Sequence, residues 1–175
     1  MPQVVLVDRQ NRKIGVEEKL VAHKKGLLHR AISIFIFNSK GELLLQQRAK
    51  NKYHSAGLWS NTVCSHPAPG ESFAHAAHRR LEEEMGFDCK LKKLYCFIYQ
   101  TEFDNGLSEN EYDCVFVGEF NGQPKPNPVE VAAYRWQNLD DLKQDILKHG
   151  DIYTFWLKLA LEQVATDHMR TIVKS

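Results

Sequence analysis

The chain has no excess of either charge, no long apolar run and no paired cysteine motif. It carries 23 basic and 22 acidic side chains among 175 residues. A nucleic-acid or anionic-membrane partner would favour a basic stripe, so neither is predicted. No window approaches the roughly 20 apolar residues that a membrane helix requires, and the N-terminus has no apolar run typical of a signal peptide. We therefore expect a cytoplasmic protein that binds neither nucleic acid nor membrane.

The four cysteines do not indicate a fold held by disulfides. They form no Cys-x-x-Cys pair and no short framework of the secreted type, so we interpret Cys64, Cys89, Cys96 and Cys114 as reduced thiols of a cytosolic protein. The chain also lacks repeats, low-complexity tracts and an interdomain linker. We predict one domain, residues 1–175, large enough to bury a substantial core.

Apolar periodicity predicts a mixed α/β domain. Runs of β-branched and aromatic residues between turn residues predict strands at 4–8, 31–37, 42–48, 59–64, 91–103, 111–120 and 131–136. Asn38 and Gly41 predict a tight hairpin between the second and third of these. Steps of three and four residues predict helices over 71–85, up to about 148, and over 152–164. The sum is an α/β (α+β) fold with helices packed on a sheet.

The stretch Asn-Thr-Val-Cys-Ser-His-Pro at 61–67 carries the strongest functional signal. Cys64 and His66 are two residues apart, so their side chains share a face if the segment is a strand. Glu109 and Glu111 share a face by the same rule. One surface could therefore carry a thiol, a metal-binding imidazole and two carboxylates, which is enough chemistry for an active site.

A glutamate-rich segment follows this stretch, and its spacing resembles the signature of the Nudix family. In that family a loop–helix–loop binds the metal of a diphosphate substrate. Two positions differ from the signature. Ser65 stands where the signature opens with glycine, and Arg80 stands where Nudix hydrolases carry the first glutamate of their Arg-Glu-x-x-Glu-Glu run. The matching positions are Glu71, Arg79, Glu83, Glu84 and Gly86.

The second difference favours one group within that family, because a cation has replaced a metal ligand. Together with the Cys-x-His stretch and Glu109-Asn110-Glu111, Arg80 makes the chain resemble the type 1 isopentenyl-diphosphate isomerases over about residues 19–156. These are Nudix-fold enzymes that interconvert isopentenyl and dimethylallyl diphosphate in isoprenoid biosynthesis. The resemblance implies a Nudix-type fold, a mixed β-sheet sandwiched by helices, and this isomerase activity.

The resemblance also implies roles for individual residues. Cys64 and Glu111 would be the catalytic acid/base groups, with Tyr99 beside the reacting carbons. Glu84 and the backbone carbonyl of Cys64 would serve a Mg²⁺ held by the diphosphate. A further divalent metal, Mn²⁺, Zn²⁺ or Mg²⁺, would be held by His23, His29, His66, Glu109 and Glu111. Substrate contacts would come from Lys19, Arg48, Lys52, Ser65, Arg80 and Trp156. The partner would be a small molecule, isopentenyl diphosphate, and we expect a monomer.

Moving a double bond by one carbon requires these residue types. One proton is added at one end and another is removed from the far side, through a state close to a tertiary carbocation. Cys64 and Glu111 come from different predicted strands that could flank a pocket. Tyr99 and Trp156 could stabilise the cation through their ring faces, by about 2 kcal/mol or more per ring when desolvated.

Simpler interpretations stay open from the sequence alone. A buried cysteine is more often a packing residue than a catalyst, and Arg79–Glu83 and Arg80–Glu84 could be ordinary i,i+4 pairs of a solvated helix. A Nudix hydrolase of a nucleoside diphosphate would use the same helix, but it should keep glutamate at position 80 and needs no thiol. A non-enzymatic module with a structural zinc would leave the carboxylates and arginines unexplained. We interpret five other histidines as surface residues: His54, His75, His78, His149 and His168.

Overall fold

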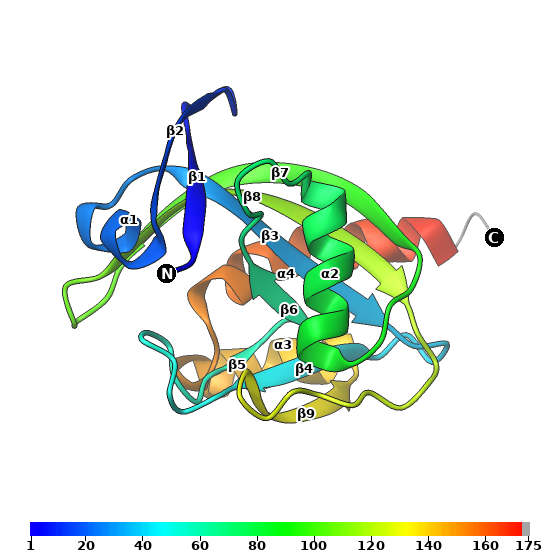
Figure 1. Ribbon diagram of the computed structural model, residues 1–175. Coiled ribbons are helices and arrows are strands. Elements are labelled where there is room, and N and C mark those ends of the chain that lie inside the picture. Colours follow the sequence, from blue (N-terminus) through cyan, green and yellow to red (C-terminus); the bar gives the residue numbers. More distant parts are fainter. Residues whose placement is uncertain (173–175) are drawn as a thin grey trace.

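The computed structural model describes residues 1–172, with side chains as far as residue 167. Within this part of the chain, a nine-stranded mixed sheet lies between helices (Figure 1). The strands are β1 Gln3–Val7, β2 Lys13–Glu18, β3 His29–Phe37, β4 Leu43–Arg48, β5 Trp59–Ser60, β6 Val63–Ser65, β7 Leu91–Glu102, β8 Ser108–Glu119 and β9 Val131–Gln137. The helices are α1 Lys19–Lys25, α2 Phe73–Met85, α3 Leu139–Lys148 and α4 Phe155–Ile172, with a 3₁₀ turn at Gly150–Ile152.

Strand β3 is the centre of the sheet. It pairs in parallel with β8 from His29↔Glu111 to Phe37↔Glu119, and antiparallel with β6, where Ser33 lies opposite Cys64. Strand β8 pairs antiparallel with β7 on its other side. Since β6, β3, β8 and β7 are neighbours in that order, the sheet brings together the strands that carry most of the predicted site.

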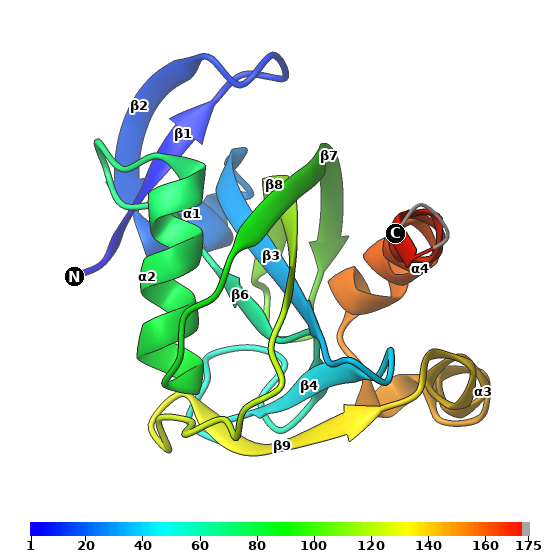
Figure 2. The same ribbon diagram turned by 90° about the vertical axis from the view of Figure 1, so that its right-hand side faces the viewer.

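The two faces of β3 supply two separate cores. Ile32, Ile34 and Ile36 pack in a cluster with Leu81 and the rest of the apolar side of α2. Phe35 and Phe37 point the other way and pack with apolar residues of α3 and α4. Figure 2 shows α2 on one side of the sheet and the two later helices on the other. A strand buried on both faces reads as a continuous apolar run, as this one does. The predicted fold, helices on both sides of a mixed sheet, is confirmed.

Several element boundaries differ from the prediction. Strand β2 and helix α1 were not expected, and the strand expected at 59–64 is divided into β5 and β6. Asn61 and Thr62 lie at the division because their side chains take over backbone pairing. The Asn61 amide donates to Ile34 O and Val63 O, while Thr62 Oγ1 donates to Leu44 O. The predicted hairpin turn after β3 exists, but β3 and β4 pair only at Phe37↔Leu43, and β4 continues beside β9.

The interpretation of all four cysteines as reduced thiols is wrong for two of them. Cys96 and Cys114 form a disulfide, whereas Cys64 and Cys89 are free. The cause is the register of β7 and β8, which places the two cysteines directly opposite each other with Cα atoms 4.1 Å apart. A spacing of 18 residues gives no sign of this pairing. Across the described residues, no helix combines the length and the apolar character that crossing a membrane requires.

Candidate active site

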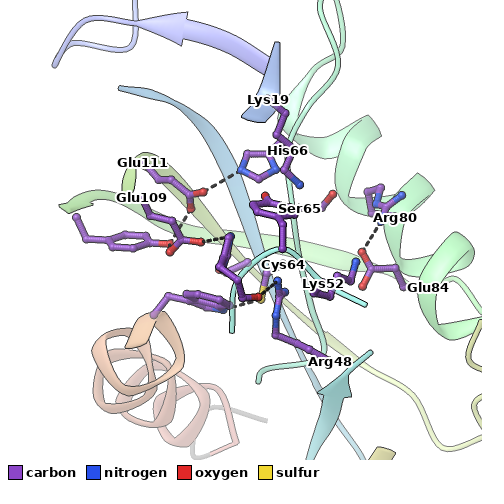
Figure 3. Close-up of a pocket in the computed structure, with 15 residues that line it drawn as sticks. Lys19, Arg48, Lys52, Cys64, Ser65, His66, Arg80, Glu84, Glu109 and Glu111 are labelled. Carbon is purple, nitrogen blue, oxygen red and sulfur yellow. Dashed lines mark hydrogen bonds and ion pairs between the residues drawn. The ribbon is translucent and has the colours of Figure 1, made fainter. Parts of the chain in front are cut away.

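A polar pocket lies where α1, β6, β8 and α2 converge. Every site residue predicted from the sequence lines it except His23 and His29, which lie within 4.0 Å of its Glu111. In Figure 3 the two glutamates of β8 lie on one side, Arg80 and Glu84 lie on the opposite side, and Cys64 lies between them. The sequence thus predicted residues of one pocket, although they come from seven elements and from the connections that follow β4 and β6.

Two fully buried histidines present unpaired nitrogens to this pocket. His23 Nδ1 lies 2.7 Å from the carbonyl of Lys19, and His29 Nδ1 lies 2.7 Å from the carbonyl of Leu27. A carbonyl accepts a hydrogen, so each Nδ1 is the protonated nitrogen and each Nε2 keeps its lone pair. Neither Nε2 has a hydrogen-bond partner. Imidazoles that bind a metal are oriented in this way, with one nitrogen donating to a carbonyl and the other facing the ion.

Glu111 completes a set of potential ligands with these histidines. Its Oε1 lies 2.8 Å from His66 Nε2, 3.5 Å from His29 Nε2 and 4.0 Å from His23 Nε2. The four ligand atoms all lie within 4.8 Å of one another. Three imidazoles and a carboxylate are donor groups that a divalent metal ion can accept. The unpaired Nε2 atoms of two buried rings are the observation that supports a divalent cation here.

The two carboxylates of β8 share one hydroxyl. Tyr99 Oη lies 2.9 Å from Glu109 Oε2 and 2.7 Å from Glu111 Oε2, so its one hydrogen can be donated to either carboxylate. Burial raises the pKa of Glu109 well above its usual value, and the charge of Glu111 adds to this effect. Burial also acts to raise the pKa of Glu111, but contacts with His29 and His66 outweigh it and hold that pKa well below the usual value. Of the two carboxyl groups, Glu111 therefore gives up its proton more readily.

The Cys64 thiol is held by three polar neighbours. Its sulfur accepts from Trp156 Nε1 at 2.7 Å, its S–H donates to Asn61 Oδ1 at 3.0 Å, and Ser60 Oγ lies 3.2 Å away. Burial raises the pKa of the thiol to about 12, against the smaller opposing effect of the Ser60 hydrogen bond. The sulfur therefore carries its proton at neutral pH, as a proton donor must. Neither Ser60 nor Asn61 was assigned a role from the sequence, although Asn61 opens the 61–67 stretch.

The opposite side of the pocket carries the predicted cations. Arg80 Nη2 donates to Glu84 Oε1 at 2.6 Å, and Lys52 forms an ion pair with Glu130. Burial, together with repulsion from the nearby Lys52 and Arg48, lowers the pKa of Lys19 to about 8. A lysine that is disfavoured in its charged form by surrounding cations indicates a site that an anion would neutralise.

One histidine is not where the sequence analysis placed it. His54, interpreted as a surface residue, is only 6% exposed. Its Nε2 lies 3.2 Å from Glu109 Oε1, and burial lowers its pKa to about 2. It lies in an irregular loop, where no periodicity shows which way a side chain points. His75 and His149 are exposed and His78 is partly exposed, whereas the side chain of His168 lies outside the described residues.

The sequence predicted a single set of five metal ligands, but the structure places Glu109 in a second group. It groups most closely with His23 and His54, while Glu111 groups with His23, His29 and His66. The two groups share His23, so they adjoin. Ser33, Tyr53 and His54 are the lining residues that the sequence analysis missed.

Comparison with known proteins agrees with this geometry. The NUDIX domain family model matches residues 27–156. The chain is 52% identical over 162 residues to Isopentenyl-diphosphate Delta-isomerase 2 of Aromatoleum aromaticum, covering 93% of this chain and 86% of that protein. It is 54% identical over 155 residues to Isopentenyl-diphosphate Delta-isomerase 2 of Photorhabdus laumondii, covering 89% and 88%.

Among solved structures, the fold resembles that of a Deinococcus radiodurans protein, with a TM-score of 0.70 at 18% identity, covering 84% of this chain and 90% of that one. It also resembles a MutT Nudix hydrolase from Burkholderia pseudomallei, with a TM-score of 0.63 at 26% identity, covering 78% and 98%. The fold is thus similar to that of a hydrolase, whereas the higher sequence identity is to proteins named as isomerases.

Proposed function

The chain belongs to the Nudix family and, within it, to the isopentenyl-diphosphate Delta-isomerases, and from this membership and the pocket we propose how it works. It interconverts isopentenyl diphosphate and dimethylallyl diphosphate, in isoprenoid biosynthesis, by adding one proton and removing another through a carbocation-like state. The observation that carries the assignment is that one pocket contains the half-buried thiol of Cys64 on β6 and the buried carboxylate of Glu111 on β8.

Cys64 supplies the proton in this proposal. Its thiol is protonated at neutral pH, and the indole N–H of Trp156 donates to the sulfur at 2.7 Å. That N–H would stabilise the negative charge that the sulfur gains once its proton is delivered to the alkene. Because the S–H donates to Asn61 Oδ1 when no substrate is present, the hydrogen must turn toward the alkene during the reaction.

Glu111 accepts the second proton on the other side of the substrate. Contacts with His29 and His66 hold its pKa low, and the Tyr99 hydroxyl donates to its Oε2. When bound among His23, His29, His66, Glu109 and Glu111, a divalent metal would supply positive charge that favours the ionised carboxylate. The rings of Tyr99 and Trp156 would face the cationic carbon skeleton and exclude the water that could trap it as an alcohol.

The diphosphate would lie at the cationic side of the pocket. Lys19, Arg48, Lys52, Arg80 and Ser65 all line the pocket and would contact the diphosphate. A Mg²⁺ bound to the diphosphate, with Glu84 and the carbonyl of Cys64 facing it, would neutralise charge without cleaving the anhydride. The hydrolase alternative is disfavoured because Arg80 occupies a position that carries a metal-binding glutamate in Nudix hydrolases. Arg80 is instead paired with Glu84.

The proposal is tested by incubating purified protein with isopentenyl diphosphate and Mg²⁺, with Mn²⁺ or Zn²⁺ added in parallel samples. We expect dimethylallyl diphosphate with negligible release of phosphate. Phosphate release at a rate comparable with isomerisation would refute the isomerase assignment and restore the hydrolase one. We further propose that residues 1–175 act as one domain and as a monomer in the cytoplasm, and size-exclusion chromatography with light scattering tests the monomer.

A further inference from the structure

His54 makes contacts that its position in a loop does not require. It lies in the connection between β4 and β5, yet it is 6% exposed. Its Nε2 lies 3.2 Å from Glu109 Oε1. Its ring stacks on Phe103, from the connection between β7 and β8, with centroids 4.7 Å apart and an interplanar angle of 11°. The ring of Trp156 is perpendicular to that of His54, with centroids 6.0 Å apart. One loop side chain thus lies against β8, α4 and the connection between β7 and β8.

The backbone around His54 is shaped to hold it there. Ser55 has a φ of 50°, in the left-handed region that a non-glycine residue adopts at a cost of about 1–3 kcal/mol when the surroundings enforce it. The carbonyl of His54 accepts from Arg48 Nη2 at 3.3 Å. The carbonyl of Tyr53 accepts from Asn105 Nδ2 at 3.0 Å, which ties this loop to the β7–β8 connection. The loop is therefore anchored on both sides of His54.

These contacts also favour one tautomer of the ring. Ser55 Oγ lies 3.4 Å from His54 Nδ1, so its hydroxyl hydrogen can point to that nitrogen. A neutral ring then carries its own hydrogen on Nε2, directed at Glu109. The other oxygen of Glu109 lies 2.9 Å from the Tyr99 hydroxyl. His54 and Tyr99 together would leave the carboxylate of Glu109 a single orientation.

We infer that His54 is a positioning residue, which holds Glu109 in the orientation that the metal-binding cluster of the proposed isomerase needs. Direct ligation is the alternative, because His23, His54 and Glu109 place ligand atoms within 4.8 Å of one another. That group shares His23 with the cluster around Glu111, however, and one imidazole nitrogen binds one ion. Only two ligands would remain for a second ion. We therefore favour a hydrogen bond from the His54 ring that orients Glu109.

Three variants separate these roles. His54→Phe keeps the ring that stacks on Phe103 but removes the N–H donor. His54→Gln restores a donor N–H at about the position of Nε2. His149→Phe is the matched control, because His149 is an exposed histidine between α3 and the 3₁₀ turn. The readout is the affinity of the metal-free protein for Zn²⁺ and for Co²⁺, measured in competition with a chelating dye and without substrate. Circular dichroism and the melting temperature of each metal-free variant show that it has folded.

We expect His54→Phe to weaken metal binding about 10–100-fold, which is the usual range for the loss of a residue that orients a metal ligand. His54→Gln should recover most of that affinity, and His149→Phe should match the wild type. Unchanged affinity in a folded His54→Phe protein would overturn the inference. A second result would also overturn it. If His54→Gln bound the metal as weakly as His54→Phe, and changed the Co²⁺ absorption bands in the same way as His66→Gln, the His54 ring would be a metal ligand.

The metal measurement is independent of the isomerase assay. A wild-type protein that binds the ion but forms no dimethylallyl diphosphate would refute the proposed function and leave the role of His54 to be decided by the variants. If the wild-type protein is active but the His54 variants bind the metal as tightly as it does, the inference alone is refuted.

Discussion

Replacing Cys64 by alanine separates catalysis from stability more sharply than any other change in the pocket. A positioned acid/base group contributes roughly 10²–10⁴-fold to the rate. At about 1.36 kcal/mol for each factor of ten, this equals about 2.7–5.4 kcal/mol of activation free energy. An alkene is a feeble base, so we expect the loss in kcat to lie toward the upper end of this range.

The hydrogen bonds around the thiol predict a much smaller effect on folding. If the sulfur is removed, Trp156 Nε1 keeps Ser60 Oγ at 2.9 Å and Asn61 Oδ1 keeps the Ser60 hydroxyl at 3.0 Å. No buried polar group loses its last partner, so the free energy of unfolding should fall by only about 1 kcal/mol, the net worth of one hydrogen bond. Two effects of such different size can be measured independently.

The assay compares Cys64→Ala with Cys89→Ala, since Cys89 is the other free cysteine and does not line the pocket. Steady-state isomerisation gives kcat, calorimetry gives substrate affinity, and a thermal melt gives stability. An epoxide analogue of the substrate should label Cys64 and not Cys89. A Cys64→Ala protein that keeps a third of normal activity would show that the thiol only packs, and Tyr99 would become the next candidate for proton transfer.

Three further outcomes are expected. His66→Ala removes the nitrogen 2.8 Å from Glu111, so elemental analysis should show loss of the bound divalent ion, and an unchanged content would contradict the cluster. Trp156→Phe keeps an aromatic ring but removes the indole N–H that donates to the Cys64 sulfur. A hydrogen bond to a charged group contributes about 1.5–3 kcal/mol, so kcat should fall about tenfold or more. A change in KM alone would contradict this role. With a thiol pKa of about 12, only about 10⁻⁵ of the Cys64 side chain is thiolate at pH 7. The rate of alkylation by iodoacetamide, measured by mass spectrometry, should therefore rise about tenfold per pH unit up to pH 10. Fast labelling at pH 7 would show instead that the thiol is ionised.

The sequence predicted those parts of the fold and site in which regular structure repeats a pattern. The apolar run of β3 and the three- and four-residue steps of α2 identified both elements. The two-residue spacing of Cys64 with His66, and of Glu109 with Glu111, indicated side chains that share a face, and all four line one pocket.

What the sequence could not predict depends on register or on irregular backbone. The pairing of Cys96 with Cys114 follows from how β7 and β8 align. Strand β2 was missed because its side chains are exposed or half-buried, with Ile14 68% exposed, so it lacks an apolar face. His54 was missed because its direction is set by Ser55 and by contacts with a distant loop.

The parallel pairing of β3 with β8 determines when the metal-binding cluster can form during folding. His29 and Glu111 are direct partners in this pairing, although 82 residues separate them in the chain. Pairing strands across so long a loop is slow, because its ends must lose conformational freedom before their contacts stabilise them. During synthesis, His23 and His29 leave the ribosome well before Glu111 exists. The histidines are therefore available first, and an ion bound by all the proposed ligands would mark the pairing of β3 with β8.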